Sequence, residues 1–308
     1  PSHIVMPAIH LKREEVGKMF EEKGISKEIG NYDPTYLTRC ARQHLRNQFM
    51  EAGAGMTGCN FGVAATGDCV VCTNEGNADM TTSMPKLHIV AMGIEKLVPD
   101  YKSVAVFQRL LCRCGTGQPT TAFTSHFRQA RPGAEMHVVL VDNGRSDILA
   151  DEAHWQTLKC MRCGACMNTC PVYRRSGGYS YTYFIPGPIG VNLGMLKNPQ
   201  KYSDNVSACT LCLSCDNVCP SKVGPGSQIY VWRQSLAKLG KADPVKKAMS
   251  NGMKYLFDRP ALYTTALKFA PLVNLVPECC THFSNWNAWG IGHAKKSFHQ
   301  LWKEGKVK

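Results

Sequence analysis

The feature that most constrains this chain is a cysteine spacing that occurs twice. "CMRCGACMNTCP" runs from Cys160 to Pro171 and "CTLCLSCDNVCP" runs from Cys209 to Pro220, so both segments spell C-x-x-C-x-x-C-x-x-x-C-P. A cubane [4Fe–4S] cluster needs a thiolate on each of its four irons, and three cysteines at three-residue intervals can wrap around three corners. The repeated spacing therefore predicts iron–sulfur chemistry.

The fourth corner of each cluster has to come from elsewhere in the chain. In two-cluster ferredoxins, the cysteine before the proline serves the other cluster. We therefore predict crossed ligation, which would fix the two clusters close together and suit electron transfer between them. The first cluster takes Cys160, Cys163, Cys166 and Cys219, and the second takes Cys209, Cys212, Cys215 and Cys170.

Two other uses of clustered cysteines fit less well. Zinc usually takes separated C-x-x-C pairs rather than a tight triple. Disulfide frameworks belong to small secreted domains, whereas this chain has 308 residues and no visible signal peptide. It also lacks an apolar run of about 18 residues, so no spanning helix is expected. We expect a cytoplasmic protein, with peripheral attachment to a membrane left open.

The formal net charge of +13 has two interpretations. A solvated basic surface explains it without a partner, and docking of an acidic partner is the alternative. No nucleic-acid-binding motif accompanies the charge, so nucleic acid is not expected as a partner. No G-x-G-x-x-G fingerprint for a flavin or nicotinamide is visible between a strand and a helix. The absence of a flavin or nicotinamide fingerprint favours a subunit of a redox assembly over a complete enzyme.

We predict three parts: an α/β domain over 1–148, a two-cluster module over 149–225 and a helical basic tail over 226–308. In the first part, patterns predict helices near 10–25, 33–53 and 100–114, the second of them capped by Asp33. A hairpin over 61–73 should turn near Thr66-Gly67, and strands are expected at 87–94 and 135–142. In the tail, the apolar segment 259–277 either packs on its own domain or docks to a partner or membrane surface.

Further cysteines lie outside the repeats. Four of them form C-x-x-C and C-x-C pairs that could bind zinc or another cluster: Cys69, Cys72, Cys112 and Cys114. On a strand, however, Cys69 and Cys72 point to opposite faces because side chains alternate. We favour buried free thiols for these four, and extend that interpretation to Cys40, Cys59, Cys279 and Cys280.

Two polar segments are weaker candidates for ligand or partner contacts. The loop "TNEGNADMTTSMP" offers Asn74, Glu75 and Asn77, although the same residues are common in turns. Arg174 and Arg175 follow the first motif closely. Three interpretations of this pair stay open. The two arginines could stabilise the reduced cluster, bind a carboxylate in bidentate fashion, or form an exposed, solvated basic pair. His154 precedes the first motif, and a lone histidine is more often structural.

The two motifs belong to a longer recognisable pattern. "LKCMRCGACMNTCPVYRRSGG", "PGPIG" and "CTLCLSCDNVCP" make the chain resemble the bacterial lactate-utilisation protein B family, and "GCNFGVAATGD" and "KKSFHQLW" extend the resemblance over nearly the whole chain. The resemblance implies a lactate-utilisation (LUD) domain of CoA-transferase-like α/β fold, then an α-helical-ferredoxin-type two-cluster module, then a helical tail.

The same resemblance implies an electron-transfer subunit, non-catalytic or co-catalytic, in an assembly that oxidises L-lactate to pyruvate. The implied partners are a CCG-type cysteine-rich protein and a smaller LUD-domain protein; no electron acceptor is indicated. Family members usually carry roughly a hundred more residues before "PSHIVMPAIH", so Pro1 is expected to lie inside the LUD domain. The family's usual histidine after the double glycine is Tyr179 here.

Two rival functions stay open at this point. The chain could serve as a ferredoxin-like adaptor in a different redox complex, of the hydrogenase or heterodisulfide-reductase type. Alternatively, its clusters could only hold the fold or sense the redox state.

Overall fold

The computed structural model describes residues 2–6, 8–239, 244–269 and 298–306. The chain divides into two compact units, residues 1–238 and 239–308. Over the described ranges, no helix combines the length and the apolar character needed to cross a bilayer. The predicted boundaries near 148 and 225 are not tested by this division and stay predictions.

Two helices open the first unit, and both were predicted. Helix α1 spans Arg13–Glu22 and is followed by Gly24 in a left-handed conformation with φ +67°. Helix α2 spans Pro34–Glu51, and the Asp33 carboxylate accepts a hydrogen bond from the Tyr36 backbone N–H at 2.9 Å. This cap satisfies one of the N–H groups that a helix start leaves without a partner. The buried face of α2 carries Leu37 and Cys40.

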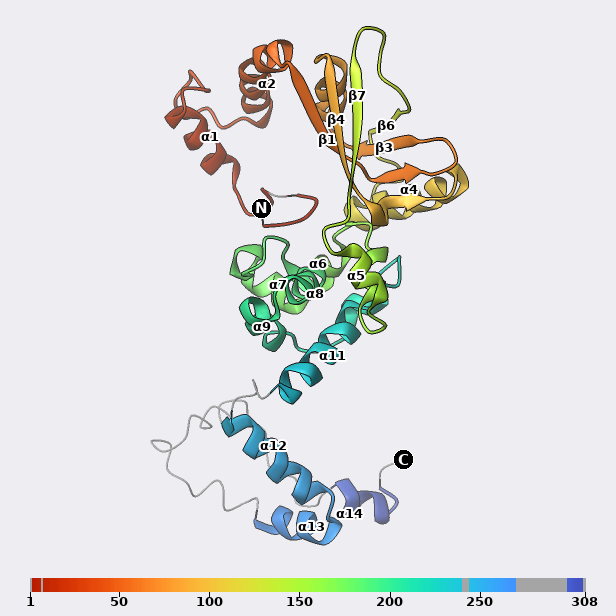
Figure 1. The fold of residues 1–308 in the computed structure, drawn as a ribbon. Coiled ribbons are helices and arrows are strands. Elements are labelled where there is room, and N and C mark those ends of the chain that lie inside the picture. The colour runs from red at the N-terminus through yellow and green to blue at the C-terminus, as the bar shows by residue number, and fades with distance from the viewer. Residues whose placement is uncertain (1, 7, 240–243, 270–297, 307–308) are drawn as a thin grey trace. The chain divides into compact units, whose positions relative to one another are not determined.

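The first sheet is parallel, with strand order β1-β4-β7 (Figure 1). Its strands are β1 Ala54–Gly58, β4 Leu87–Gly93 and β7 Glu135–Val141. The strands predicted at 87–94 and 135–142 are confirmed. Helix α3, Asn77–Ser83, packs on β1. Strand β4 alternates buried and half-buried residues, as a central strand does, whereas β7 forms an edge that leaves Val138, Val139 and Leu140 exposed.

The second sheet has the order β5-β2-β3-β6 and contains the predicted hairpin. Its strands are β2 Phe61–Val63, β3 Asp68–Thr73, β5 Leu97–Val98 and β6 Phe123–Phe127. Strands β2 and β3 pair antiparallel, and Gly67 takes φ +75° at the turn. The short 3-10 turn η1, Ile94–Lys96, leads from β4 into β5.

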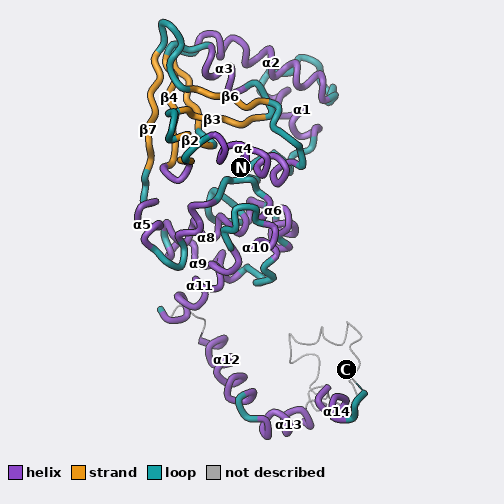
Figure 2. The backbone as a smooth tube through the Cα atoms, turned by 90° about the vertical axis from the view of Figure 1, so that its right-hand side faces the viewer, coloured by secondary structure: helices purple, strands orange, loops and turns teal. Residues whose placement is uncertain are grey.

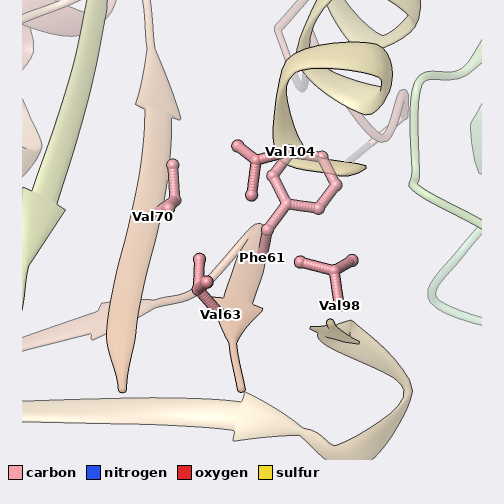
Figure 3. Close-up of a cluster of buried hydrophobic side chains, with 5 residues drawn as sticks. All are labelled: Phe61, Val63, Val70, Val98 and Val104. Carbon is pink, nitrogen blue, oxygen red and sulfur yellow. The ribbon is translucent and has the colours of Figure 1, made fainter. Parts of the chain in front are cut away.

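Helix α4, Tyr101–Thr116, covers the second sheet and was predicted. Asp100 caps it by accepting from the Ser103 backbone N–H at 2.9 Å. The helix packs against β2 and β5, and Figure 3 shows the cluster of buried side chains between them. That cluster consists of Phe61, Val63, Val70, Val98 and Val104. Together the two sheets and their helices confirm a layered α/β domain.

A set of short helices carries the two cysteine motifs. In Figures 1 and 2 it gathers on the side of the sheets where α4 lies. Its elements are α5 Arg145–Ala150, η2 Trp155–Lys159, α6 Ala165–Thr169, α7 Pro171–Ser176, η3 Gly178–Ser180, α8 Gly187–Lys197, α9 Pro199–Ser207, α10 Ser214–Val218 and α11 Pro225–Lys238. Helix α8 is buried at the centre and packs on α6, α9 and α11.

The described part of the second unit is helical, as predicted for the tail. Its helices are α12 Pro244–Phe257, α13 Pro260–Phe269 and α14 Phe298–Lys303. Leu262 on α13 is exposed. The rest of the apolar segment beyond residue 269, together with Cys279 and Cys280, lies outside the described residues, so neither interpretation of that segment is tested.

Candidate metal centres

The two cysteine motifs share one backbone conformation. The third residue of each motif has positive φ, Arg162 at 67° and Leu211 at 54°, and so does the fifth, Gly164 at 80° and Leu213 at 58°. A five-residue helix then follows in each case, α6 in the first motif and α10 in the second. A non-glycine residue in this region costs about 1–2 kcal/mol. Its repeated use indicates that the tight winding of the three cysteines is a functional constraint.

The first motif encloses a cavity. Four cysteines line it, Cys160, Cys163, Cys166 and Cys219, together with apolar side chains that include Ile4, Ile189 and Val223. Cys170 does not line it. The structure therefore brings together the four cysteines predicted to hold the first cluster. Four sulfur donors around one apolar hollow are the donor set that a [4Fe–4S] cluster takes.

Cys170 lies instead beside the second motif. Burial raises the pKa of Cys215 to about 12, and the neighbouring Asp216, Cys209 and Cys170 add to the shift. Helices α6 and α10 pack together, with the Thr169 and Ser214 hydroxyl oxygens 2.5 Å apart. The fourth predicted ligand, Cys212, is exposed. The crossed ligand assignment remains a prediction, and this arrangement is compatible with it.

Burial and backbone donors act on these cysteines in opposite directions. Burial raises the pKa of Cys163 to about 11 and raises that of Cys166 further. A buried thiol resists ionisation, and bound metal is what offsets this cost. Backbone N–H groups also point at sulfur: Leu211 N lies 3.4 Å from Cys209 Sγ, and Val223 N lies 3.3 Å from Cys219 Sγ. Such donors stabilise added negative charge and raise a cluster's reduction potential.

Two cations beside the first motif were missed from the sequence. Lys96 Nζ donates to the Cys160 carbonyl at 3.2 Å, and burial lowers the pKa of this lysine, with Arg162 adding to the effect. Arg162, between Cys160 and Cys163, has no hydrogen-bond or ion-pair partner among the described residues. The letter R inside "CMRCG" could have signalled Arg162. Lys96 carries no local signal because it lies far from the motif in sequence.

Helix α4 packs against the first motif. Phe107, Leu110, Leu111 and Cys114 of α4 pack against a buried cluster of Met161, Cys163 and Ala165. The α/β domain and the cysteine module therefore share a hydrophobic contact at the first motif.

The weaker candidates are spread over different places. Arg174 Nε donates to the Asn168 carbonyl at 2.6 Å, Arg175 is exposed, and Tyr179 is 69% exposed. None of the three lines the cysteine cavity. Asn74 and Glu75 line a separate cavity described below, whereas Asn77 begins α3 and does not line it.

His154 has a structural environment. It is buried, its Nδ1 lies 2.8 Å from Asp151 Oδ2, and its ring stacks on Trp232 with the ring centroids 3.9 Å apart. These contacts agree with the structural interpretation.

The extra cysteines do not meet at one point. Cys59 lies beside Cys69 and lowers the pKa of its thiol, and the Cys59 thiol itself donates to the Phe61 carbonyl at 3.1 Å. Cys72 lies beside Cys112, and burial raises the pKa of Cys72 to about 11. Across the described part of the chain, no three His, Cys, Asp or Glu side chains converge to hold a single ion, so an added zinc site has no support. A four-iron cluster does not need such convergence on one ion, because each of its thiolates binds a different iron.

Two family models match parts of this chain, and several known proteins are similar to it. A LUD domain model matches residues 2–147, and a 4Fe-4S dicluster domain model matches residues 156–223. Lactate utilization protein B of Bacillus cytotoxicus is 40% identical over 99% of this chain and 67% of its own length. Lactate utilization protein B of Bacillus pumilus is 40% identical over 89% of this chain and 59% of its length.

A third relative carries a different name. The uncharacterized electron transport protein YkgF of Escherichia coli is 39% identical over 87% of this chain and 57% of its own length. The chain thus spans 57% to 67% of the length of these three relatives. No solved structure matches. On these matches, and on the cysteine-lined cavity where the two motifs meet, the chain belongs to the lactate utilization protein B family and contains a LUD domain followed by a ferredoxin-like 4Fe-4S module.

Proposed function

We propose that this chain is the iron–sulfur electron-transfer subunit of an assembly that oxidises L-lactate to pyruvate, and that it holds two [4Fe–4S] clusters. The observation that carries the proposal is the cavity in which Cys160, Cys163 and Cys166 of one motif meet Cys219 of the other. The names of the relatives, lactate utilization protein B and an electron transport protein, supply the process and the role.

The oxidation of lactate requires carriers that together accept two electrons. Oxidation of lactate to pyruvate releases two electrons and two protons. A [4Fe–4S] cluster, when bound, passes electrons one at a time. This chain's own residues would hold the clusters through eight thiolates and donate backbone N–H bonds to sulfur. Lys96 and Arg162 would offset part of the negative charge beside the first motif.

The wider assembly is also part of the proposal. The partners would be a CCG-type cysteine-rich protein and a smaller LUD-domain protein, and the reducing cytoplasm would keep the thiols available for metal. We also infer that the LUD domain has a CoA-transferase-like fold, which the parallel β1-β4-β7 sheet with α3 on one side supports.

The test is to purify the chain anaerobically and measure iron, sulfide and zinc. We expect about eight irons per chain and a paramagnetic signal after reduction with dithionite. L-lactate should reduce the clusters only after both partner proteins are added. A colourless protein that contains zinc would contradict the proposal.

Two intermediate outcomes separate the rival functions. Clusters that dithionite reduces, but that lactate with both partners does not, would make the chain an adaptor of another redox complex. Clusters that cannot be reduced and reoxidised would make their role structural.

A further inference from the structure

A second cavity lies between the LUD domain and the first cysteine motif. Its volume is about 360 Å³, within the range of small-molecule sites. The end of β3 and the loop after it, residues 73–75, form one side together with the C-terminal end of α4. Met161 and Arg162 form another side. Residues 4–6 also line it. A ligand bound here would therefore lie against the segment predicted to hold the first cluster.

Two asparagines in the cavity are oriented by backbone hydrogen bonds. Asn60 Oδ1 accepts from Cys72 N at 2.9 Å, and Asn74 Oδ1 accepts from Ala122 N at 3.2 Å. Since a backbone N–H can only donate, the oxygen of each amide is fixed on that side. Neither amide nitrogen donates to another residue in the described ranges, so both remain available to a ligand.

Arg162 supplies the charge of this cavity. It is half-buried and sits at φ +67°. It lines this cavity, the cysteine cavity and a third cavity on the side of Glu95. No described side chain pairs with its guanidinium, Glu75 at the exposed side of the cavity included. A partly desolvated guanidinium is best satisfied by a carboxylate that accepts two parallel N–H bonds.

The donor set selects a class of ligand. One unpaired cation matches a single negative charge better than a phosphate or a dicarboxylate. Two neutral amide donors match one further oxygen, such as a hydroxyl or a keto group. The Thr73 hydroxyl is already used, since it donates to the Glu75 carbonyl at 2.9 Å.

We propose that this cavity binds a small 2-hydroxy or 2-oxo monocarboxylate, with Arg162 on the carboxylate and the amides of Asn60 and Asn74 on the second oxygen. The choice of ligand class rests on the proposed function. The site itself rests on the cavity, the two oriented amides and the unpaired guanidinium.

The test is calorimetric titration of the full chain, with its clusters, against L-lactate and pyruvate. We expect saturable binding of at least one of them. Propionate lacks the second oxygen and should bind about tenfold more weakly, because the amide donors would be left without a partner. Inorganic phosphate should not compete.

Asn74→Asp is the decisive variant. It keeps the oxygen that accepts from Ala122 N but replaces the amide donor with a negative oxygen, so binding should weaken at least about tenfold. Asn198→Asp is the matched control. Asn198 Oδ1 also accepts backbone bonds, from Gln200 N at 3.1 Å and Lys201 N at 3.0 Å, but it lies outside the cavity. This control should bind like the wild type.

Arg162→Gln is the second variant and should abolish binding of both acids. Because Arg162 also lines the cysteine cavity, iron content is measured on the same preparation. If the Arg162→Gln chain lost iron, the binding measured for Asn74→Asp would decide the inference alone. A wild-type chain that carries its clusters but binds neither acid, or an Asn74→Asp chain that binds like the wild type, would overturn the inference and leave the proposed function standing. A chain without iron would overturn the proposed function and, with it, the choice of ligand class.

Discussion

The two cysteine motifs have the same spacing and the same backbone but different surroundings. The first lies under α4, whose Phe107 and Leu111 pack against Met161 and Cys163. Gly164 of this motif lies beneath His3 and Ile4. In the second motif, Cys212 and Leu213 are exposed. One repeated motif has therefore been placed in an enclosed site and in an accessible one.

The difference suggests separate roles within one relay. The first motif adjoins the LUD domain, two cations and a cavity with ligand-binding features. The second motif presents a thiol at the surface of the unit, where a partner can approach. Under the proposed function, electrons would enter near the first cluster and leave through the second.

The largest effect should come from removing the cysteine that each motif is predicted to contribute to the cluster of the other motif. Cys219→Ser removes a sulfur that lines the first cavity, and Cys170→Ser removes one beside Cys209 and Cys215. Each variant should keep about four of eight irons. The enclosed cluster should be lost in Cys219→Ser and the accessible one in Cys170→Ser. Iron analysis and the paramagnetic spectrum of the reduced protein would distinguish the two.

Cys40→Ser is the matched control for this experiment, because Cys40 is a buried thiol of α2 distant in sequence from both motifs. It should retain all the iron. If Cys170→Ser lost the signal of the enclosed cluster instead, the crossed ligation would be wrong.

The next effect concerns the left-handed residue at the fifth position of each motif. Gly164→Ala places a Cβ 2.9 Å from His3 Cε1 at φ +80°. The backbone alone should cost about 1–2 kcal/mol in the free energy of unfolding, and the clash adds to it. Leu213→Gly removes strain at φ +58° but makes the unfolded chain more flexible, so it should stay within about 1 kcal/mol of the wild type.

Thermal unfolding of both variants, each with its clusters, measures this contrast. If Gly164→Ala and Leu213→Gly lowered the free energy of unfolding equally, the contact of His3 and Ile4 with Gly164 would not distinguish the two motifs.

The contrast between the motifs also shows what could be predicted from sequence. The spacing predicted the four cysteines that line the first cavity, because cluster ligation allows only a few arrangements of cysteines. The Asp33 cap and the Thr66-Gly67 turn were predictable because both depend on residues close in sequence. The pleat of β3 likewise separated Cys69 from Cys72. Each of these rests on a local rule.

What could not be predicted depends on contacts between distant segments. Strand β1, "AGMTG", has two glycines and little β propensity, and its place beside β4 comes from the sheet. Lys96 reaches Cys160 across 64 positions of sequence. The covering of the first motif by α4 follows from packing of the whole unit. The cysteine spacing that the two motifs share therefore carried no information about which motif would be enclosed.

The smallest effect should be a shift in reduction potential confined to one cluster. Lys96→Met removes a partly buried positive charge whose Nζ lies 3.2 Å from the Cys160 carbonyl. A nearby cation stabilises the reduced, more negative cluster, so its loss should lower the potential of the first cluster by on the order of tens of millivolts. The second cluster should keep its potential. A redox titration followed by the paramagnetic signals of both clusters measures the two shifts separately.

Lys159→Met tests whether burial produces this effect. Lys159 adjoins Cys160 in sequence, but it is exposed and its Nζ lies 4.5 Å from the Trp155 ring centroid. Water and salt screen an exposed charge, so its loss should move the first potential much less. Equal shifts from Lys96→Met and Lys159→Met would mean that net charge, rather than the enclosed position of Lys96, sets the potential. Equal shifts in both clusters after Lys96→Met would remove the electrostatic difference between the two motifs.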